Sequence, residues 1–136
     1  MNSFVAVVLA LAALVTVSQA GLDKKESIEL LEKCKKETGA TEDPEQLFTS
    51  QDIPTTPEGK CMMQCVLREK KLMKGDKVDA QAVSDFFEKT YADNPDQLEK
   101  AAGAVAECAL LDVSGKDKCD VAVAYLECGK KKGFRL

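Results

Sequence analysis

The stretch CDVAVAYLEC, residues 119–128, decides the fold of this chain. A cysteine stands at each end, and the six residues from Val121 to Leu126 are all apolar. A helix that is apolar on nearly every side is buried among other elements. Cys119 and Cys128 lie nine positions apart, so at about 100° per residue they point to opposite sides of the helix. The sequence therefore predicts a central helix whose two cysteines bond to two different partners.

The chain contains six cysteines, and their number and positions indicate disulfides. Cys61 and Cys65 are four positions apart and share one face of a predicted helix, so a bond between them would be strained. We expect them to link that helix to two others. An even number of cysteines in a short secreted chain is typical of a disulfide framework. A zinc site is the alternative, but the chain has no histidine and no CxxC pair.

The first twenty residues have the features of a secretion signal. An apolar run ends at Val17, and the small residues Ser18 and Ala20 fit a signal-peptidase site. The run is too short to cross a bilayer of about 30 Å as a helix. A buried N-terminal helix is the alternative. We expect residues 1–20 to be a signal peptide, residues 21–136 to form one helical domain, and the product to be secreted and extracellular.

Capping residues mark where the other helices begin. A capping residue stands before a proline at the first helical position in Asp43-Pro44, Thr56-Pro57 and Asn94-Pro95. Asp79 and Ser114 are expected to cap two more helices, and Gly39, Gly75 and Gly129 to lie at helix ends. No segment alternates as a strand would. Helices are predicted at residues 22–38, 44–49, 57–72, 80–91, 95–111 and 116–128.

Composition narrows the range of functions. The chain of 136 residues carries 19 Lys+Arg against 23 Asp+Glu, a net charge of −4, which disfavours a nucleic-acid partner. The absence of histidine excludes a Ser-His-Asp or Cys-His centre and an HExxH zinc site. We therefore expect no enzyme activity, no cofactor and no metal site. Three disulfides also relax the need for a fully packed core, so a helical shell can enclose a hydrophobic cavity.

The cysteine spacing resembles that of a known family. It reads Cys34-x26-Cys61-x3-Cys65-x42-Cys108-x10-Cys119-x8-Cys128. In an acidic, helical and secreted chain, these intervals resemble those of the six-cysteine insect odorant-binding proteins, which include pheromone-binding and general odorant-binding proteins. The residues alone leave the pairing of the cysteines open. The resemblance implies a compact all-α domain of six helices with three interlocked disulfides, Cys34–Cys65, Cys61–Cys119 and Cys108–Cys128.

The resemblance also implies a function. Such proteins carry small hydrophobic molecules, such as odorants or pheromones, in an internal cavity through aqueous lymph toward chemosensory receptors at a membrane. We expect a monomer or a weak homodimer. By analogy with this family the cavity is expected to be lined by Leu67, Leu72, Val78, Phe87, Ala106, Ala122, Tyr125 and Phe134. For each of these residues, ordinary core packing is the alternative.

Two other classes of secreted protein are alternatives to a carrier. A saposin-like, membrane-active or lipid-binding protein is also helical and has six cysteines, but its cysteine spacing is different. A secreted lipase would need an acid-base centre, and the chain has no histidine to supply one. The tail after Cys128 is too short to form a stable replacement helix, so we expect it to act at most as a fixed lid.

Overall fold

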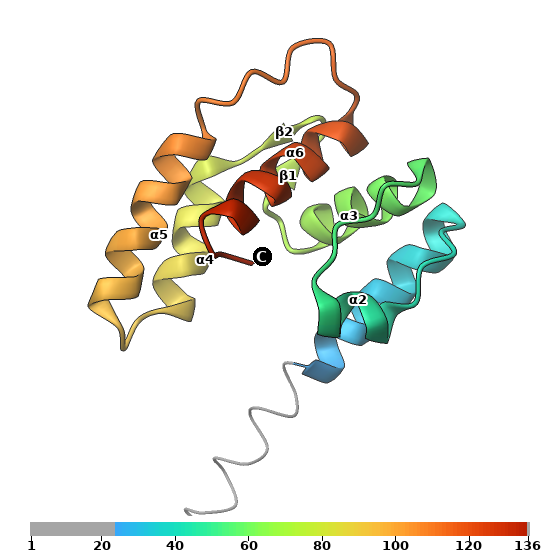
Figure 1. The fold of residues 1–136 in the computed structure, drawn as a ribbon, viewed down its shortest axis with the longest axis horizontal. Coiled ribbons are helices and arrows are strands. Elements are labelled where there is room, and N and C mark those ends of the chain that lie inside the picture. Colours follow the sequence, from blue (N-terminus) through green and yellow to red (C-terminus); the bar gives the residue numbers. More distant parts are fainter. Residues whose placement is uncertain (1–23, 136) are drawn as a thin grey trace, which may run out of the picture.

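The computed structural model describes residues 24–135, and the regular secondary structure of this part of the chain is helical apart from one short hairpin (Figure 1). The predicted all-α class is confirmed. The expected signal peptide lies outside the described residues. The described helices cover residues 24–38, α2 (Pro44–Ser50), α3 (Pro57–Glu69), α4 (Ala80–Thr90), α5 (Pro95–Cys108) and α6 (Lys118–Lys131).

Side-chain caps begin the helices largely where the sequence predicts. The caps of α2 to α5 are the four predicted residues, Asp43, Thr56, Asp79 and Asn94. The cap of α6 is Asp117 rather than the expected Ser114, since the Asp117 carboxylate accepts the Asp120 N–H at 2.9 Å. The helix also continues through Gly129 to Lys131. Its stop comes at Gly133, where φ is +85°, a value that favours glycine.

A two-stranded hairpin connects α3 to α4, and the prediction of no strands is wrong here. β1 (Met73–Lys74) pairs antiparallel with β2 (Lys77–Val78). Strands of two residues are too short to show an alternating pattern. The signal that was available is the Gly75-Asp76 turn, a dipeptide typical of hairpins. Gly75 has a φ of +59° and serves this turn instead of a helix end.

Three disulfides tie the helices together, in the pairs that the family resemblance implied. Their Cα–Cα distances are 5.6, 4.6 and 5.9 Å for Cys34–Cys65, Cys61–Cys119 and Cys108–Cys128, respectively. The first bond joins the helix of residues 24–38 to α3, and the second joins α3 to α6. The third joins the end of α5 to α6. Cys61 and Cys65 of α3 therefore bond to two different helices. Cys119 and Cys128 of α6 also bond to two different helices, α3 and α5.

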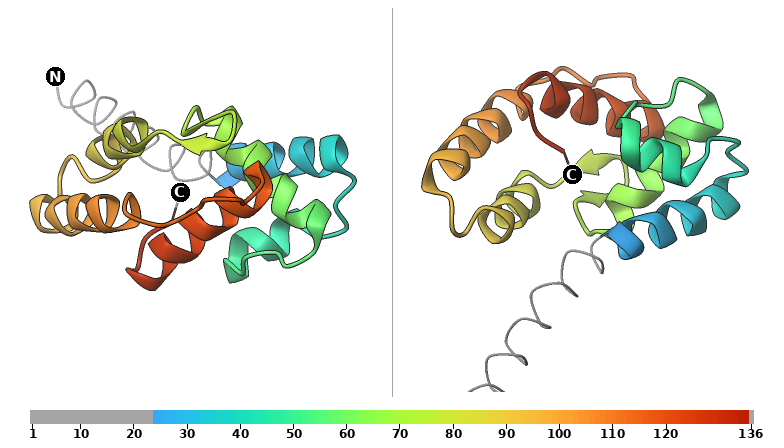
Figure 2. Two further views of the ribbon diagram at one scale, coloured as in Figure 1. Left: turned by 90° about the horizontal axis from the view of Figure 1, so that it is seen from above. Right: turned by 60° about the horizontal axis from the view of Figure 1, so that its bottom comes forward.

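The helix α6 lies at the centre of this arrangement, as the sequence predicts. Figure 1 shows α4 and α5 side by side on one flank of α6, with α2 and α3 on the other, and Figure 2 shows the same grouping from two further directions. Val121 and Ala122 of α6 are 2% and 0% exposed. They belong to the larger core cluster, which also contains Leu67, Leu72, Met73, Val83, Phe87, Ala101, Ala104 and Phe134.

Candidate ligand-binding site

A cavity of about 170 Å³ lies between α4, α5 and α6; we call it the first cavity. Its wall is mostly aliphatic and aromatic carbon, and Tyr125 is the described lining residue whose side chain carries a hydroxyl. Its described lining contains no lysine, arginine, aspartate or glutamate. The lining consists of Val78, Ala80, Val83, Phe87, Ala104, Val105, Cys108, Ala109, Tyr125, Leu126, Gly129 and Phe134.

Helical periodicity aims these side chains at one space. Val83 and Phe87 are four positions apart on α4, and Ala104 and Cys108 are four positions apart on α5, so each pair lies on one helix face. On α6, Tyr125 and Gly129 have the same spacing. The space is left open where alanine and glycine stand in place of larger side chains.

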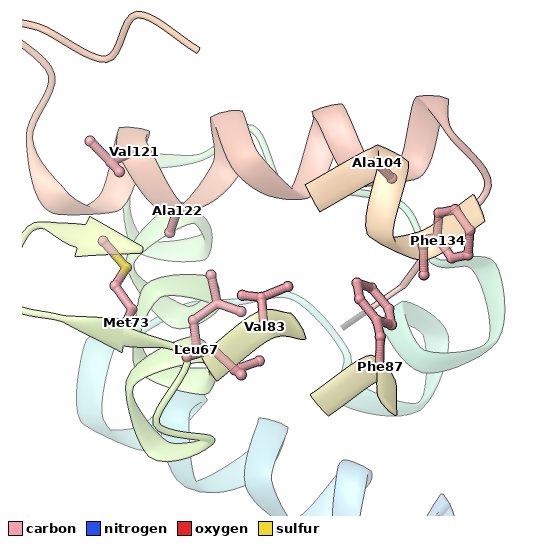
Figure 3. Packing of buried hydrophobic residues seen from close by; sticks show 10 residues of the cluster. Leu67, Met73, Val83, Phe87, Ala104, Val121, Ala122 and Phe134 are labelled. Carbon is pink, nitrogen blue, oxygen red and sulfur yellow. The ribbon is translucent and has the colours of Figure 1, made fainter. Parts of the chain in front are cut away.

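Phe134 of the C-terminal tail closes one side of the first cavity. The tail turns at Gly133, and the Phe134 N–H donates to the Gly129 carbonyl at 2.9 Å. The Phe134 ring is 7% exposed and lies with its centroid 5.4 Å from that of Phe87 and 6.1 Å from that of Tyr91. Figure 3 shows the Phe134 and Phe87 rings next to each other near Ala104. The tail is therefore packed into the fold as part of the wall.

A second cavity of about 160 Å³ lies on the other side of Phe134 and Leu126, which line both spaces. It is bounded by the helix of residues 24–38, α2, α3 and the end of α6. Sequence reasoning did not find it, because its wall comes from segments far apart in the chain. The lining consists of Ser27, Leu30, Leu31, Leu47, Phe48, Gln51, Asp52, Ile53, Met63, Val66, Lys70, Leu126, Lys130, Phe134 and Arg135.

The structure brings together only part of the site expected from the sequence. The expected residues that line the first cavity are Val78, Phe87, Tyr125 and Phe134. Leu67, Leu72 and Ala122 are instead buried in the core and line neither cavity. Ala106 is exposed on the outer face of α5 and lines neither cavity. Its neighbours Ala104 and Val105 take the inner positions, since successive helical residues point about 100° apart.

Val83 and Leu126 line the first cavity but were not among the expected residues, and the helical pattern could have indicated only Val83. Val83 lies one helical turn before Phe87, and Leu126 directly follows Tyr125. Once Phe87 is placed in a cavity, the four-residue spacing points to Val83 as well. Leu126 gives no such signal, because its place between two cavities depends on how the tail folds back.

The charged groups with shifted pKa values lie outside the first cavity. Hydrogen bonds from Lys33 and Arg68 lower the pKa of Glu69, and the Glu37 carboxylate raises that of Arg68. Lys70, which lines the second cavity, has its pKa lowered by burial and then by the nearby positive charge of Arg135. The first cavity thus suits uncharged ligands, whereas the second presents a partly buried cation.

Potential metal ligands meet at one place among residues 24–135, where Cys34, Glu37 and Cys65 lie close together. The two sulfur atoms are bonded to each other in a disulfide. They have no thiolate to offer, and a thiolate is what binds a metal ion. The remaining carboxylate of Glu37 pairs with Arg68, whose Nη2 lies 2.7 Å from Glu37 Oε2. This cluster is therefore structural.

Comparison with known proteins identifies the family. A model of the PBP/GOBP family matches residues 21–132. The chain belongs to this family of odorant-binding proteins. General odorant-binding protein 28a of Drosophila melanogaster is 31% identical over 139 residues, covering 96% of this chain and 94% of the relative. General odorant-binding protein 19d of the same species is 28% identical over 122 residues, covering 89% and 81%.

Solved structures show the odorant-binding protein fold directly. Odorant-binding protein dmelOBP28a from Drosophila melanogaster matches with a TM-score of 0.66 and 27% identity, over 84% of this chain and 92% of that one. Apis mellifera odorant binding protein 5 also matches with a TM-score of 0.66, at 18% identity over 84% and 91%. The second match bears on the fold alone.

Family membership confirms the resemblance drawn from the cysteine spacing and sets aside the saposin-like alternative. Odorant-binding proteins are secreted, non-enzymatic carriers, so the expectation that this chain is not an enzyme is confirmed. Within residues 24–135, none of the helices has both the length and the apolar content that a membrane crossing requires.

Proposed function

We propose that this odorant-binding protein binds a small, uncharged hydrophobic molecule in the first cavity and carries it through aqueous lymph toward chemosensory receptors. The observation that supports this proposal is the cavity wall of α4, α5 and α6, which is apolar and has no charged side chain among its described residues. A hydrophobic molecule gains free energy on leaving water for such a space. The volume of about 170 Å³ is below the roughly 300 Å³ of the smallest drug-sized sites, so the ligand is small.

The Tyr125 hydroxyl gives the ligand an orientation. Among the described lining residues, Tyr125 is the one with an oxygen-bearing side chain, and the others are apolar residues, glycine and the disulfide-bonded Cys108. A phenol both donates and accepts hydrogen bonds, so an alcohol, an aldehyde or an ester fits this wall with its oxygen toward Tyr125. One or two polar groups of this kind fix orientation in an apolar pocket.

We further propose that residues 1–20 are a signal peptide and that the secreted protein is a monomer or a weak homodimer. The family match begins at residue 21, directly after the expected cleavage site at Ala20. N-terminal sequencing of the protein secreted by insect cells tests the cleavage, and light scattering across a concentration series tests the oligomeric state. An N-terminus upstream of the apolar run would contradict the first of these proposals.

Displacement of a neutral fluorescent naphthylamine probe tests the carrier function. A panel of alcohols, esters and terpenoids should displace the probe from the wild-type protein. Ala104→Leu places a larger side chain in the cavity and should weaken binding by about tenfold, or 1.4 kcal/mol. Ala106→Leu is the matched control, since it adds the same group to the exposed face of the same helix. Equal affinities in two folded variants would exclude the first cavity as the site.

A further inference from the structure

The second cavity combines an apolar floor with a cationic rim. We propose that it is a separate binding site for an amphiphilic anion, that is, an aliphatic chain ending in a carboxylate. The proposal does not depend on what the first cavity binds, because Phe134 and Leu126 stand between the two spaces as a shared wall.

The floor is built by helices from the N-terminal half of the chain. The helix of residues 24–38 contributes Leu30 and Leu31, α2 contributes Leu47, and α3 contributes Met63 and Val66. Leu31 is 8% exposed. This surface is hydrocarbon and thioether, so it favours an aliphatic chain over a polar ligand.

The rim carries three cationic side chains against one carboxylate. Lys70, Lys130 and Arg135 line the cavity together with Asp52. The Lys130 ammonium lies 3.8 Å from the Asp52 carboxylate, a loose pair. Among residues 24–135, no carboxylate forms an ion pair with Lys70 or Arg135. The rim thus has positive charge that the described part of the chain leaves uncompensated.

Aromatic rings and a backbone carbonyl hold these two cations at the cavity. The Lys70 ammonium lies 5.5 Å from the centre of the Phe86 ring, and the Arg135 guanidinium carbon lies 5.7 Å from the centre of the Phe48 ring. Arg135 Nη2 also donates to the Phe48 carbonyl at 3.4 Å. Such contacts attract a cation but do not neutralise it. Lys70 and Arg135 therefore keep positive charge that can pair with a bound anion.

The environment of Lys70 favours an incoming anion. Burial and the positive charge of Arg135 together lower the pKa of the Lys70 ammonium, which means that its charged form is disfavoured where it stands. A carboxylate placed beside both cations would remove part of this penalty. The guanidinium fork suits a carboxylate in particular, because two parallel N–H groups match its two oxygens.

Calorimetry with octanoate, octanol and octylammonium tests the site, since these probes share one chain length that suits a cavity of about 160 Å³ and differ in head-group charge. Octanoate should bind the wild-type protein more tightly than octylammonium. The deciding comparison is the effect of Lys70→Gln, because an alcohol can also enter the first cavity. Lys70→Gln should reduce octanoate affinity by about tenfold and leave octanol affinity unchanged. Lys71→Gln is the matched control, since it removes the same charge from the exposed neighbour. An equal loss of affinity for octanoate and octanol, or no effect of Lys70→Gln in a folded protein, would overturn the proposal.

Methyl chemical shifts show which cavity is occupied. Octanoate should shift the methyl signals of Met63 and Ile53 in the second cavity. The neutral naphthylamine probe should shift those of Val83 and Val105 in the first. Octanoate shifts confined to Val83 and Val105 would place the anion in the first cavity and overturn the inference. Failure of the neutral probe to bind would instead count against the carrier function of the first cavity, so the two failures are distinguishable.

Discussion

Phe134 packs edge-on against Phe87, with the two ring centroids 5.4 Å apart and the ring planes at 61°. One ring belongs to the C-terminal tail and the other to α4, so the end of the chain is attached to the wall of the first cavity. Edge-to-face pairs of this kind stabilise a fold beyond the area that they bury. The tail is consequently a fixed part of the fold.

Removing the Phe134 ring should open the first cavity and destabilise the fold. Phe134→Ala should lower the free energy of unfolding by about 3 kcal/mol, the lower end of the range usual for the loss of a buried phenylalanine ring. Urea denaturation measures this change. Ligand dissociation in stopped-flow experiments should become several-fold faster. Phe134→Leu keeps part of the wall, so its stability and its rate of ligand dissociation should lie between those of the wild type and Phe134→Ala. Unchanged dissociation in a folded Phe134→Ala protein would mean that the ligand does not leave past this ring.

Ligand affinity in the first cavity should depend little on pH. The chain has no histidine, and the shifted carboxylates, Glu69, Asp79 and Asp112, all have a lowered pKa. These groups stay charged throughout the mildly acidic range. Between about pH 5.5 and 7.5, affinity for a neutral ligand should change by less than about threefold, or 0.65 kcal/mol. A loss of more than tenfold in probe titrations would point to a buried carboxylate with a raised pKa.

Asp79 should make the stability of the fold sensitive to strong acid. The Ala82 N–H, and then Lys74, lower the pKa of Asp79 from its ordinary value of 3.8. A lowered carboxylate pKa stabilises the folded state above that ordinary value, and the contribution is lost as the pH falls through the folded pKa. Asp79→Asn keeps a capping side chain without the charge. In urea titrations the variant should be less stable than the wild type at neutral pH, and the difference should vanish in strong acid.

Gly59 should not tolerate a side chain. A Cβ built there would lie 2.6 Å from Pro54 Cβ and 2.7 Å from Thr56 Oγ1. Gly59→Ala should therefore lower the free energy of unfolding by about 1–3 kcal/mol, the usual effect of overpacking. Gly103→Ala is the control, because open space surrounds that position in α5 and alanine is the better helix former there. It should raise stability by roughly 0.5–1 kcal/mol.

Peptide mapping under non-reducing conditions should recover the pairs Cys34–Cys65, Cys61–Cys119 and Cys108–Cys128 from the secreted protein. The helix faces require that Cys61 and Cys65 bond to different helices, and that Cys119 and Cys128 do so too. A Cys61–Cys65 or Cys119–Cys128 linkage as the main species would be incompatible with this fold. Mass spectrometry of linked peptides makes the measurement.

The sequence predicted helix starts better than helix ends, because starts depend on local chemistry. A capping residue followed by proline leaves few alternatives, and the prolines of α2, α3 and α5 each stand at the first helical residue. Ends are set by packing. The apolar Leu110 and Leu111 favoured extending α5 to residue 111, but Leu110 is 85% exposed and α5 ends at Cys108.

The candidate site was predicted less completely, since it depends on how helices rotate against one another. Ala104 and Ala106 are chemically identical, yet one lines the first cavity and the other faces solvent. Nothing local in α5 decides between them. The second cavity was beyond prediction for a stronger reason: Leu30, Val66 and Arg135 come from distant parts of the chain and meet only once the disulfides and the tail are in place.

The Cys108–Cys128 bond has a consequence for the range of ligand sizes. Of the three helices around the first cavity, α5 and α6 are cross-linked where Cys108 joins the wall, whereas α4 carries no cysteine. Two sides of the space therefore keep a fixed separation, and the third is held by non-covalent contacts such as Phe87 on Phe134. A molecule too large for the cavity must displace α4. The chain length of the preferred ligand would then be set by how firmly α4 is anchored. Substitutions in α4 that do not contact the ligand should therefore still change which member of a series of ligands of increasing chain length binds best.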